Sequence, residues 1–253
     1  MRIAVSGTAN IGKTTVIGDF LASWPSYKFE NYTYRDKLVE ENLEHSSKTN
    51  KKVQSLILND MVKNLKKYKR DDNVIFDRCP LDNIVYSLWS LGKKDSDIDE
   101  EFIDKCLPIV KEAMKDLDII FFIPITKHQN IDIVEDGTRE TDPVYIKEID
   151  NFFKVAQRHY HENPQENPFF PHEDSPAMIE IFGSELERIQ MIKLYVDAEG
   201  DLIGGDGGSD IFNPENLDMM EKLLEDQKLA KDDEAELKKT LENIKEMNKD
   251  FKS

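Results

Sequence analysis

The feature that most constrains this sequence is a glycine-rich segment close to its start, Gly7-Thr8-Ala9-Asn10-Ile11-Gly12-Lys13-Thr14-Thr15. The segment fits the spacing G-x-x-x-x-G-K-[ST]. An apolar run, Ile3-Ala4-Val5, precedes it, and a helical pattern from Val16 to Leu21 follows it. Strand, loop and helix in that order are the context that a phosphate-binding loop requires. The segment therefore predicts a site for the phosphates of a nucleoside triphosphate.

Each residue type in this loop suits phosphate binding for a physical reason. Gly7 and Gly12 allow tight turns that present backbone N–H groups to phosphate oxygens, and the helix beginning near Lys13 adds the positive end of its dipole. We expect Lys13 to reach the β- and γ-phosphates and the Thr14 hydroxyl to ligate Mg²⁺. The loop thus predicts ATP and Mg²⁺ as cofactors, with the nucleotide held by Gly7, Asn10, Ile11, Gly12, Lys13, Thr14 and Thr15.

Apolar runs alternate with helical patterns through the first three quarters of the chain. The sequence predicts strands at Arg2–Ser6, Tyr27–Phe29, Asn73–Asp77, Asp118–Ile123 and Ala177–Phe182. It predicts helices over Lys13–Ser23, most of Asn31–Lys69, Leu81–Leu91, Asp97–Lys115, Pro143–Tyr160 and Glu185–Met191. This alternation indicates an α/β protein with a parallel, doubly wound sheet. Together with the loop, it predicts the three-layer P-loop NTPase fold, with about five parallel strands flanked by helices.

Composition limits the partners and the compartment. No run approaches 18 apolar residues, so no membrane span is expected. The first predicted strand begins at once, so we expect no signal peptide. The two cysteines, Cys79 and Cys106, have neither metal-ligand spacing nor a disulfide framework, which is typical of a reducing cytoplasm. A net charge of −17 disfavours nucleic acid as a partner, although a local groove can still be basic.

A second motif begins where the predicted strand Asn73–Asp77 ends in an acid. The spacing of Asp77-Arg78, Asp82 and Tyr86 resembles the D-R-[YF]-x-x-S-x-x-A-Y-Q signature of thymidylate kinases and the E-R-S segment of deoxynucleoside kinases. The Cys-Pro-Leu-Asp that follows Arg78 is closer to small P-loop kinases often classified as AAA-type ATPases, including many from bacteriophages and relatives of the ribosylnicotinamide kinases. A further segment resembles the lid of those enzymes, and its residues are Gly137-Thr138-Arg139, Asp142-Pro143, Asp150, Phe153 and Tyr160.

The resemblance covers about residues 1–190 and implies a role for each matching position. Lys13 would neutralise charge on the transferred phosphoryl group. Asp77 would contact the metal or the acceptor, so that Thr14 and Asp77 are the implied Mg²⁺ ligands. Arg78 would bind an acceptor phosphate or the phosphoryl group in flight. Arg139 would act as an internal arginine finger from the lid.

Two positions on the acceptor side depart from the families. Glu30, at the end of a strand, matches in place the carboxylate that deoxynucleoside kinases use on the acceptor hydroxyl, but its sequence neighbourhood differs. Asp82 stands where thymidylate kinases have serine. A carboxylate there disfavours a nearby substrate phosphate unless Arg78 or Mg²⁺ compensates its charge. This weakens the case for thymidine monophosphate as the acceptor.

The sequence predicts two regions. Residues 1–192 form a P-loop kinase-like domain with a mobile lid at about 126–142. Residues 193–253 form a small hairpin, a glycine-rich link and an acidic helical tail. Residues 197–253 hold 17 acids and 8 bases, which is −9 of the net charge. Two amphipathic helices are predicted in this tail, at Glu215–Ala230 and Glu234–Phe251. Their apolar stripes favour packing onto the core or onto a second copy of the chain.

The leading hypothesis is ATP- and Mg²⁺-dependent phosphoryl transfer to a small acceptor, a nucleoside or a (deoxy)nucleoside monophosphate. One alternative is a kinase acting on nucleic acid, at a 5′ end or a modified base, and it depends on two stretches. The stretch Lys63–Arg70 is basic, although a run of charges of this kind is more often a solvated helix face. The segment Tyr34-Arg35-Asp36 approximates the acid and arginine region of polynucleotide kinases. Another alternative is an NTP-dependent switch or assembly protein with slow hydrolysis.

Overall fold

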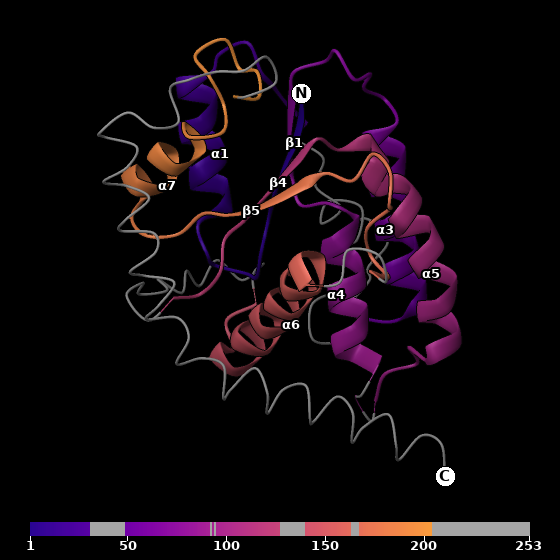
Figure 1. The fold of residues 1–253 in the computed structure, drawn as a ribbon. Helices are drawn as coiled ribbons and strands as arrows, with labels where there is room; N and C mark the ends of the chain where they lie inside the picture. Colours follow the sequence, from indigo (N-terminus) through magenta and orange to yellow (C-terminus); the bar gives the residue numbers. More distant parts are fainter. Residues whose placement is uncertain (31–48, 92, 94, 127–139, 163–166, 204–253) are drawn as a thin grey trace.

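The computed structural model describes residues 1–30, 49–91, 93, 95–126, 140–162 and 167–203. These residues form a central sheet with helices on both faces (Figure 1). All five strands are parallel and lie in the order β2-β3-β1-β4-β5. Their bounds are β1 Arg2–Ser6, β2 Lys28–Glu30, β3 Val74–Asp77, β4 Ile119–Phe122 and β5 Ala177–Glu180. The predicted parallel sheet of about five strands is therefore confirmed.

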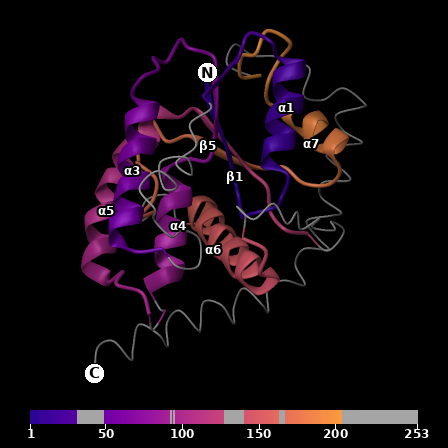
Figure 2. The same cartoon turned by 180° about the vertical axis from the view of Figure 1, so that it is seen from behind.

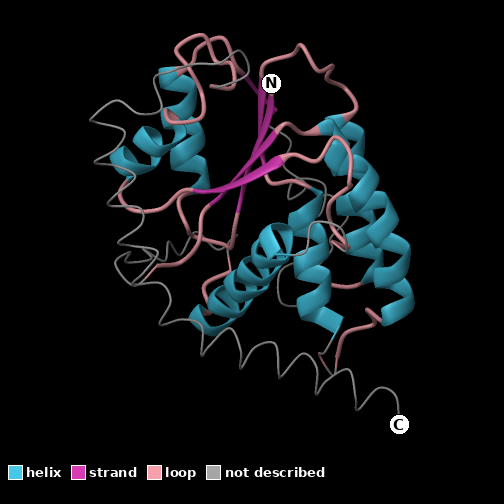
Figure 3. Ribbon diagram, viewed as in Figure 1, coloured by secondary structure: helices cyan, strands magenta, loops and turns pink. Residues whose placement is uncertain are grey.

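The helices fall into two layers, which Figures 1 and 2 show from opposite sides and Figure 3 shows by secondary structure. On one face lie α1 and α7, and on the other lie α3, α4, α5 and α6. The bounds are α1 Lys13–Ser23, α3 Lys51–Leu65, α4 Pro80–Leu91, α5 Glu100–Ala113, α6 Pro143–Glu162 and α7 Glu185–Ile192, with a 3₁₀ turn η2 at Met114–Asp116. The three-layer arrangement matches the prediction.

The two cores follow from the alternation of side chains along the strands. In β1, Ile3 and Val5 point to the core beneath α1 and α7, whereas Ala4 points to the larger core beneath α3, α4, α5 and α6. The same alternation places Phe121 in the first core and Phe122 in the second. Strands buried on both faces read as continuous apolar runs, which is why the sequence located them well.

The element bounds differ from the predicted ones at a few ends. The strand predicted at Tyr27–Phe29 runs from Lys28 to Glu30, and Tyr27 is buried, with its hydroxyl donating to the backbone oxygen of Gly200 at 2.7 Å. The helix predicted to begin at Asp97 begins after Asp99, whose side chain accepts from the Phe102 N–H and caps the helix. A side-chain cap of this kind sets where a helix starts.

Several predictions concern residues outside the described ones. Most of the lid, including Arg139, lies there, as do Tyr34-Arg35-Asp36 and the two acidic C-terminal helices. Residues 193–203, where the sequence predicts a hairpin, are described, and a single antiparallel bridge joins Val196 to Leu202. No helix in the described part of the chain is long and apolar enough to cross a membrane.

Candidate active site

The glycine-rich loop lies between the end of β1 and the start of α1, as predicted. Gly7 has φ 139°, Asn10 has φ 58° and Gly12 has φ 87°, all in the left-handed half of backbone space. A Cβ on Gly7 would lie 2.7 Å from the backbone oxygen of Ile123, so only glycine fits there. The loop therefore has the strained turns that a phosphate cradle needs.

The first turn of α1 is open to an anion. Gly12 is its N-cap and supplies no side-chain cap, and no acidic residue occupies the first turn. Thr14 and Thr15 are exposed there. Backbone N–H groups at an uncapped helix N-terminus attract negative charge, so this end of α1 fits a phosphate group.

Lys13 is buried, and its ammonium lies inside the loop. Its Nζ donates to the backbone oxygen of Gly7 at 3.0 Å and to that of Thr8. The loop is also tied to the segment around the start of α6. Thr8 Oγ1 donates to the Ile146 backbone oxygen at 2.8 Å, and Asn10 Nδ2 donates to that of Glu140 at 2.9 Å. These bonds link the loop to the end of the predicted lid and to the first turn of α6.

Asp77 ends β3 beside this loop. Val5 of β1 pairs with Asp77, so the phosphate loop and this carboxylate leave neighbouring strands at the same edge of the sheet. Asp77 Oδ1 is buried and has no hydrogen-bond partner among the described residues. The same residues contain no group of three His, Cys, Asp or Glu side chains that could hold a metal. A single carboxylate oxygen of this kind is compatible with Mg²⁺, which proteins commonly bind with few side chains and substrate phosphates.

Arg78 follows Asp77 with φ 80°, a conformation that is rare for a residue with a side chain. Its side chain is buried, and Nη1 donates to Asp82 Oδ1 at 3.1 Å and to the Tyr86 hydroxyl at 3.2 Å. The guanidinium carbon also lies 5.2 Å from the centre of the Tyr86 ring. Arg78 is therefore held by an internal ion pair rather than by one on the surface.

The charge of Asp82 is compensated within the protein. The side chain is 1% exposed, and besides Arg78 its carboxylate accepts from the Ser6 hydroxyl and from the Cys79 N–H, the latter at 3.0 Å. The departure from the thymidylate kinase signature thus has a structural role. Asp82 orients Arg78 and ties the start of α4 to the end of β1.

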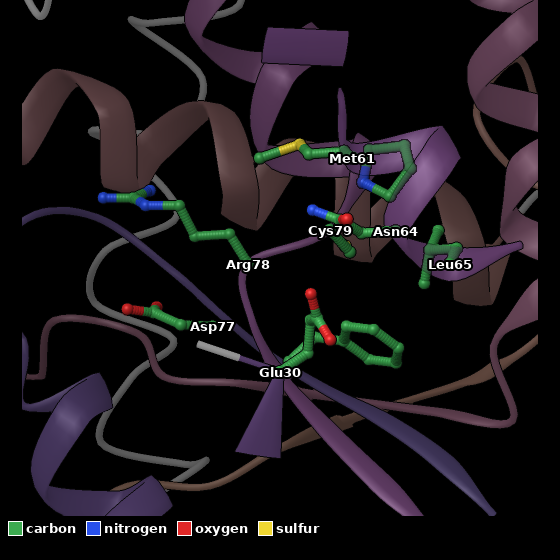
Figure 4. Close-up of a pocket in the computed structure, with 9 residues that line it drawn as sticks. Glu30, Met61, Asn64, Leu65, Asp77, Arg78 and Cys79 are labelled. Atoms are coloured by element: carbon green, nitrogen blue, oxygen red, sulfur yellow. The ribbon is translucent and has the colours of Figure 1, made fainter. Parts of the chain in front are cut away.

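A pocket lies at the ends of β2 and β3, under α3 (Figure 4). Its lining combines apolar side chains with three residues predicted for the site, Glu30, Asp77 and Arg78. The other lining residues are Met61, Asn64, Leu65, Phe76, Cys79 and Pro80. In Figure 4, the Glu30 carboxylate points into the space below Asn64, whereas Asp77 and Arg78 extend to one side. The structure thus places Glu30, Asp77 and Arg78 around one pocket.

Glu30 is held by two donors from the turn that follows α3. Lys67 Nζ donates to Glu30 Oε1 at 2.9 Å, and the Tyr68 hydroxyl donates to Oε2. Burial raises the pKa of Glu30, but the hydrogen bonds from Tyr68 and Lys67 outweigh it and leave the pKa below its ordinary value. The same bond to Glu30, with burial, raises the pKa of Tyr68 to about 12. Glu30 is therefore a carboxylate, and Tyr68 a phenol, at neutral pH.

The basic stretch Lys63–Arg70 is partly neutralised. Lys67 pairs with Glu30, and Arg70 pairs with Asp174 in an exposed ion pair. Lys63, Lys66 and Lys69 are exposed. The helix predicted to continue to Lys69 ends at Leu65, so most of this stretch is a turn. The arrangement favours a solvated surface over a contact surface for nucleic acid.

Sequence reasoning missed three residues of this site. Tyr68 and Lys67 were placed only in a charged stretch, and Asn64 was not considered. Asn64 is 6% exposed, and its Nδ2 has no hydrogen-bond partner among the described residues. Buried polar groups almost always have partners, so this amide is an exception among the residues that line the pocket. In the sequence, the one signal for Asn64 was that a polar residue occurs on the mostly apolar face of the helix.

A family model described as an AAA domain matches residues 2–164. The chain belongs to this AAA domain family. The matched residues include the phosphate loop, Glu30 and the Asp77-Arg78 pair. No curated protein matches the chain.

Among solved structures, the NadR protein in complex with NR is similar in fold. It has 14% sequence identity and a TM-score of 0.53, and the match covers 77% of this chain and 51% of that chain. The chain thus spans about half the length of that NadR structure. This likeness shows a shared fold and extends beyond the end of the family model.

Two nucleotide-related kinases also match, at lower structural similarity. Deoxyadenosine kinase from M. mycoides, with products dCMP and a flexible dCDP bound, has 15% identity and a TM-score of 0.46, covering 77% of this chain and 96% of that chain. Thymidylate kinase from Candida albicans has 14% identity and a TM-score of 0.43, covering 76% and 89%.

Proposed function

We propose that this protein is a kinase that transfers a phosphoryl group from ATP, with Mg²⁺, to a nucleoside or a (deoxy)nucleoside monophosphate. One observation carries the proposal. The phosphate loop after β1 lies beside a separate pocket at the ends of β2 and β3, and Asp77 borders both. Transfer to a bound acceptor needs two adjoining sites of this kind, whereas simple hydrolysis needs only water beside the donor.

On the donor side, each group would have a distinct role. Bound ATP would supply the phosphoryl group, and Mg²⁺ held by Thr14 and Asp77 would neutralise charge on its oxygens. Lys13 would leave its loop carbonyls and turn to the phosphates. These interactions act by positioning and by electrostatic stabilisation, because phosphoryl transfer requires little covalent chemistry from the protein.

On the acceptor side, Glu30 would accept the proton of the attacking hydroxyl if the acceptor is a nucleoside. Its carboxylate is ionised at neutral pH and points into the pocket. Arg78, oriented by Asp82, would bind an anionic group of the acceptor or the phosphoryl group in flight. Arg139 from the lid is proposed as the arginine finger. A cytoplasmic location belongs to the same proposal, and two buried, free cysteines are compatible with it.

An acceptor panel tests the proposal. Purified protein is given MgATP and, one at a time, the common ribo- and deoxynucleosides and their monophosphates, and ADP release is measured. We expect one acceptor class to stimulate ADP release at least about tenfold, with the product confirmed by mass spectrometry. Lys13→Met should reduce the stimulated rate by about 10³-fold, the scale of losing a charge contact to the transferred group. Failure of every acceptor to stimulate the wild type would contradict the proposal.

A further inference from the structure

Arg188 on α7 lies buried against the phosphate loop, although it is 177 residues away from it in the sequence. The side chain is 3% exposed, and Nη1 donates to the backbone oxygen of Ile11 at 2.8 Å. Neither the loop motif nor the kinase resemblance pointed to this residue. Its contact lies in the middle of the loop, at the peptide that joins Ile11 to Gly12.

The geometry of that peptide gives the contact a consequence. The C=O and N–H of a trans peptide point in opposite directions. Because Arg188 holds the Ile11 carbonyl on the α7 side, the Gly12 N–H is directed away from α7. A carbonyl that accepts a charged hydrogen bond also polarises its own peptide, which makes the N–H a better donor.

The second glycine of the motif is needed for this contact. A Cβ on Gly12 would lie 2.8 Å from Arg188 Nη1, and φ at Gly12 is 87°. A side chain at Gly12 would therefore displace the guanidinium as well as strain the turn. Gly12 thus serves the phosphate on one side of the loop and Arg188 on the other.

Arg188 carries a charge that the described residues do not neutralise. It forms no ion pair with a carboxylate in that part of the chain, and its Nε has no hydrogen-bond partner there. Burial lowers the pKa of the guanidinium, against a weaker opposing effect of Glu185. Arginine nevertheless stays protonated in proteins. Burying such a charge is costly unless an opposite charge compensates it.

We propose that Arg188 is a positioning residue of the donor site, which holds the Ile11–Gly12 peptide in its phosphate-binding orientation and supplies a buried positive charge that the triphosphate neutralises. The inference rests on the proposed function, because it takes a nucleoside triphosphate as the occupant of the loop. It adds a second cation, behind the loop, to Lys13 inside it.

The test compares Arg188→Met, which removes the charge, with Arg188→Lys, which keeps it. Arg70→Met is the matched control, because it removes an exposed arginine whose ion pair with Asp174 contributes little to stability. Each full-length variant is assayed for MgATP and MgADP affinity by calorimetry and for thermal unfolding with and without nucleotide.

We expect Arg188→Met to weaken MgATP binding by at least about tenfold, as for loss of one buried charge contact, and to weaken MgADP binding by less. Arg188→Lys keeps the charge and should lose no more than about threefold in MgATP affinity. Without nucleotide, Arg188→Met should unfold at the same temperature as the wild type or higher, because an uncompensated charge has been removed. Arg70→Met should bind both nucleotides like the wild type.

The inference is overturned by MgATP affinity in Arg188→Met within about twofold of the wild type. It is also overturned if Arg188→Met unfolds at a lower temperature while the stabilisation by MgATP is unchanged, since that result defines a purely structural residue. If the wild type itself binds no ATP, both the proposed function and this inference fail. If the wild type binds ATP and only the Arg188 results disagree, the proposed function stands alone.

Discussion

The Asp82 carboxylate is buried between Arg78, the Ser6 hydroxyl and the Cys79 N–H, and each contact joins a different part of the site. Its charge and that of Arg78 compensate each other inside the protein. Buried pairs of this kind stabilise little in total but are costly to break, because the remaining charge is left without a partner.

Asp82→Asn should therefore destabilise the protein by about 3 kcal/mol and reduce phosphoryl transfer, because Arg78 loses its charged partner. Urea unfolding and the acceptor assay measure the two effects. The double variant Arg78→Met/Asp82→Leu removes both charges and should recover most of the stability but none of the activity. Wild-type stability in Asp82→Asn would show that the pair is not the constraint described here.

The Tyr68–Glu30 hydrogen bond makes a prediction about pH. The bond lowers the pKa of Glu30, so its contribution to stability is present above the ordinary carboxyl pKa and is lost as pH falls through the lowered value. In Tyr68→Phe the pKa of Glu30 should rise, and the acidic limb of kcat/KM should move to higher pH. A pH–rate profile measures this shift.

Tyr195→Phe is the control for that profile, because it removes the same hydroxyl from an exposed tyrosine that lies outside the pocket lining. Its acidic limb should coincide with that of the wild type. If Tyr68→Phe also leaves the limb unmoved, Glu30 is not the group that titrates in the reaction.

At the scale of the element, the strand–loop–helix unit β1–α1 contains glycines with opposite roles. Gly7 sits in a left-handed turn against the Ile123 backbone, whereas Gly18 lies within α1 and has no atom within 4 Å of a would-be Cβ. One glycine is therefore required by its surroundings, and the other only weakens the helix.

Gly7→Ala should destabilise the protein by about 1–3 kcal/mol and abolish MgATP binding, because the Cβ would meet a backbone oxygen in a strained turn. Gly18→Ala is the matched control and should stabilise the protein by about 0.5–1 kcal/mol, since alanine favours the helix. Chemical denaturation and calorimetry measure both. Equal effects of the two substitutions would contradict the assigned roles.

At the scale of the whole molecule, net charge bears on the choice between small acceptors and nucleic acid. The chain has a net charge of −17, and two cations of its basic stretch are paired with Glu30 and Asp174. Repulsion of this size opposes binding to a polyanion such as DNA.

We therefore expect no transfer of labelled phosphate from ATP to single- or double-stranded oligonucleotides, at any salt concentration from about 50 to 200 mM. Gel electrophoresis of the oligonucleotides measures this directly, with the acceptor found in the panel as the positive control. Label on an oligonucleotide that falls steeply with rising salt would instead support the nucleic-acid kinase.

The sequence by itself determined the local parts of this protein. The loop spacing predicted a phosphate site, the apolar runs predicted β1, β3, β4 and β5, and the strand ends predicted where Glu30 and Asp77 lie. These features depend on residues that are close together in the chain, so their patterns can be read without knowing the fold.

Only the tertiary structure decided which side chains meet. Asp82 with Ser6, Tyr68 with Glu30, and Arg188 with Ile11 are pairs separated by 76, 38 and 177 residues. Such contacts depend on strand order and on the layer that each helix joins, which no local pattern specifies. In the sequence, Lys67 and Arg188 therefore look like ordinary surface charges. They join the candidate site only because the parallel sheet places the carboxyl ends of its strands at one edge.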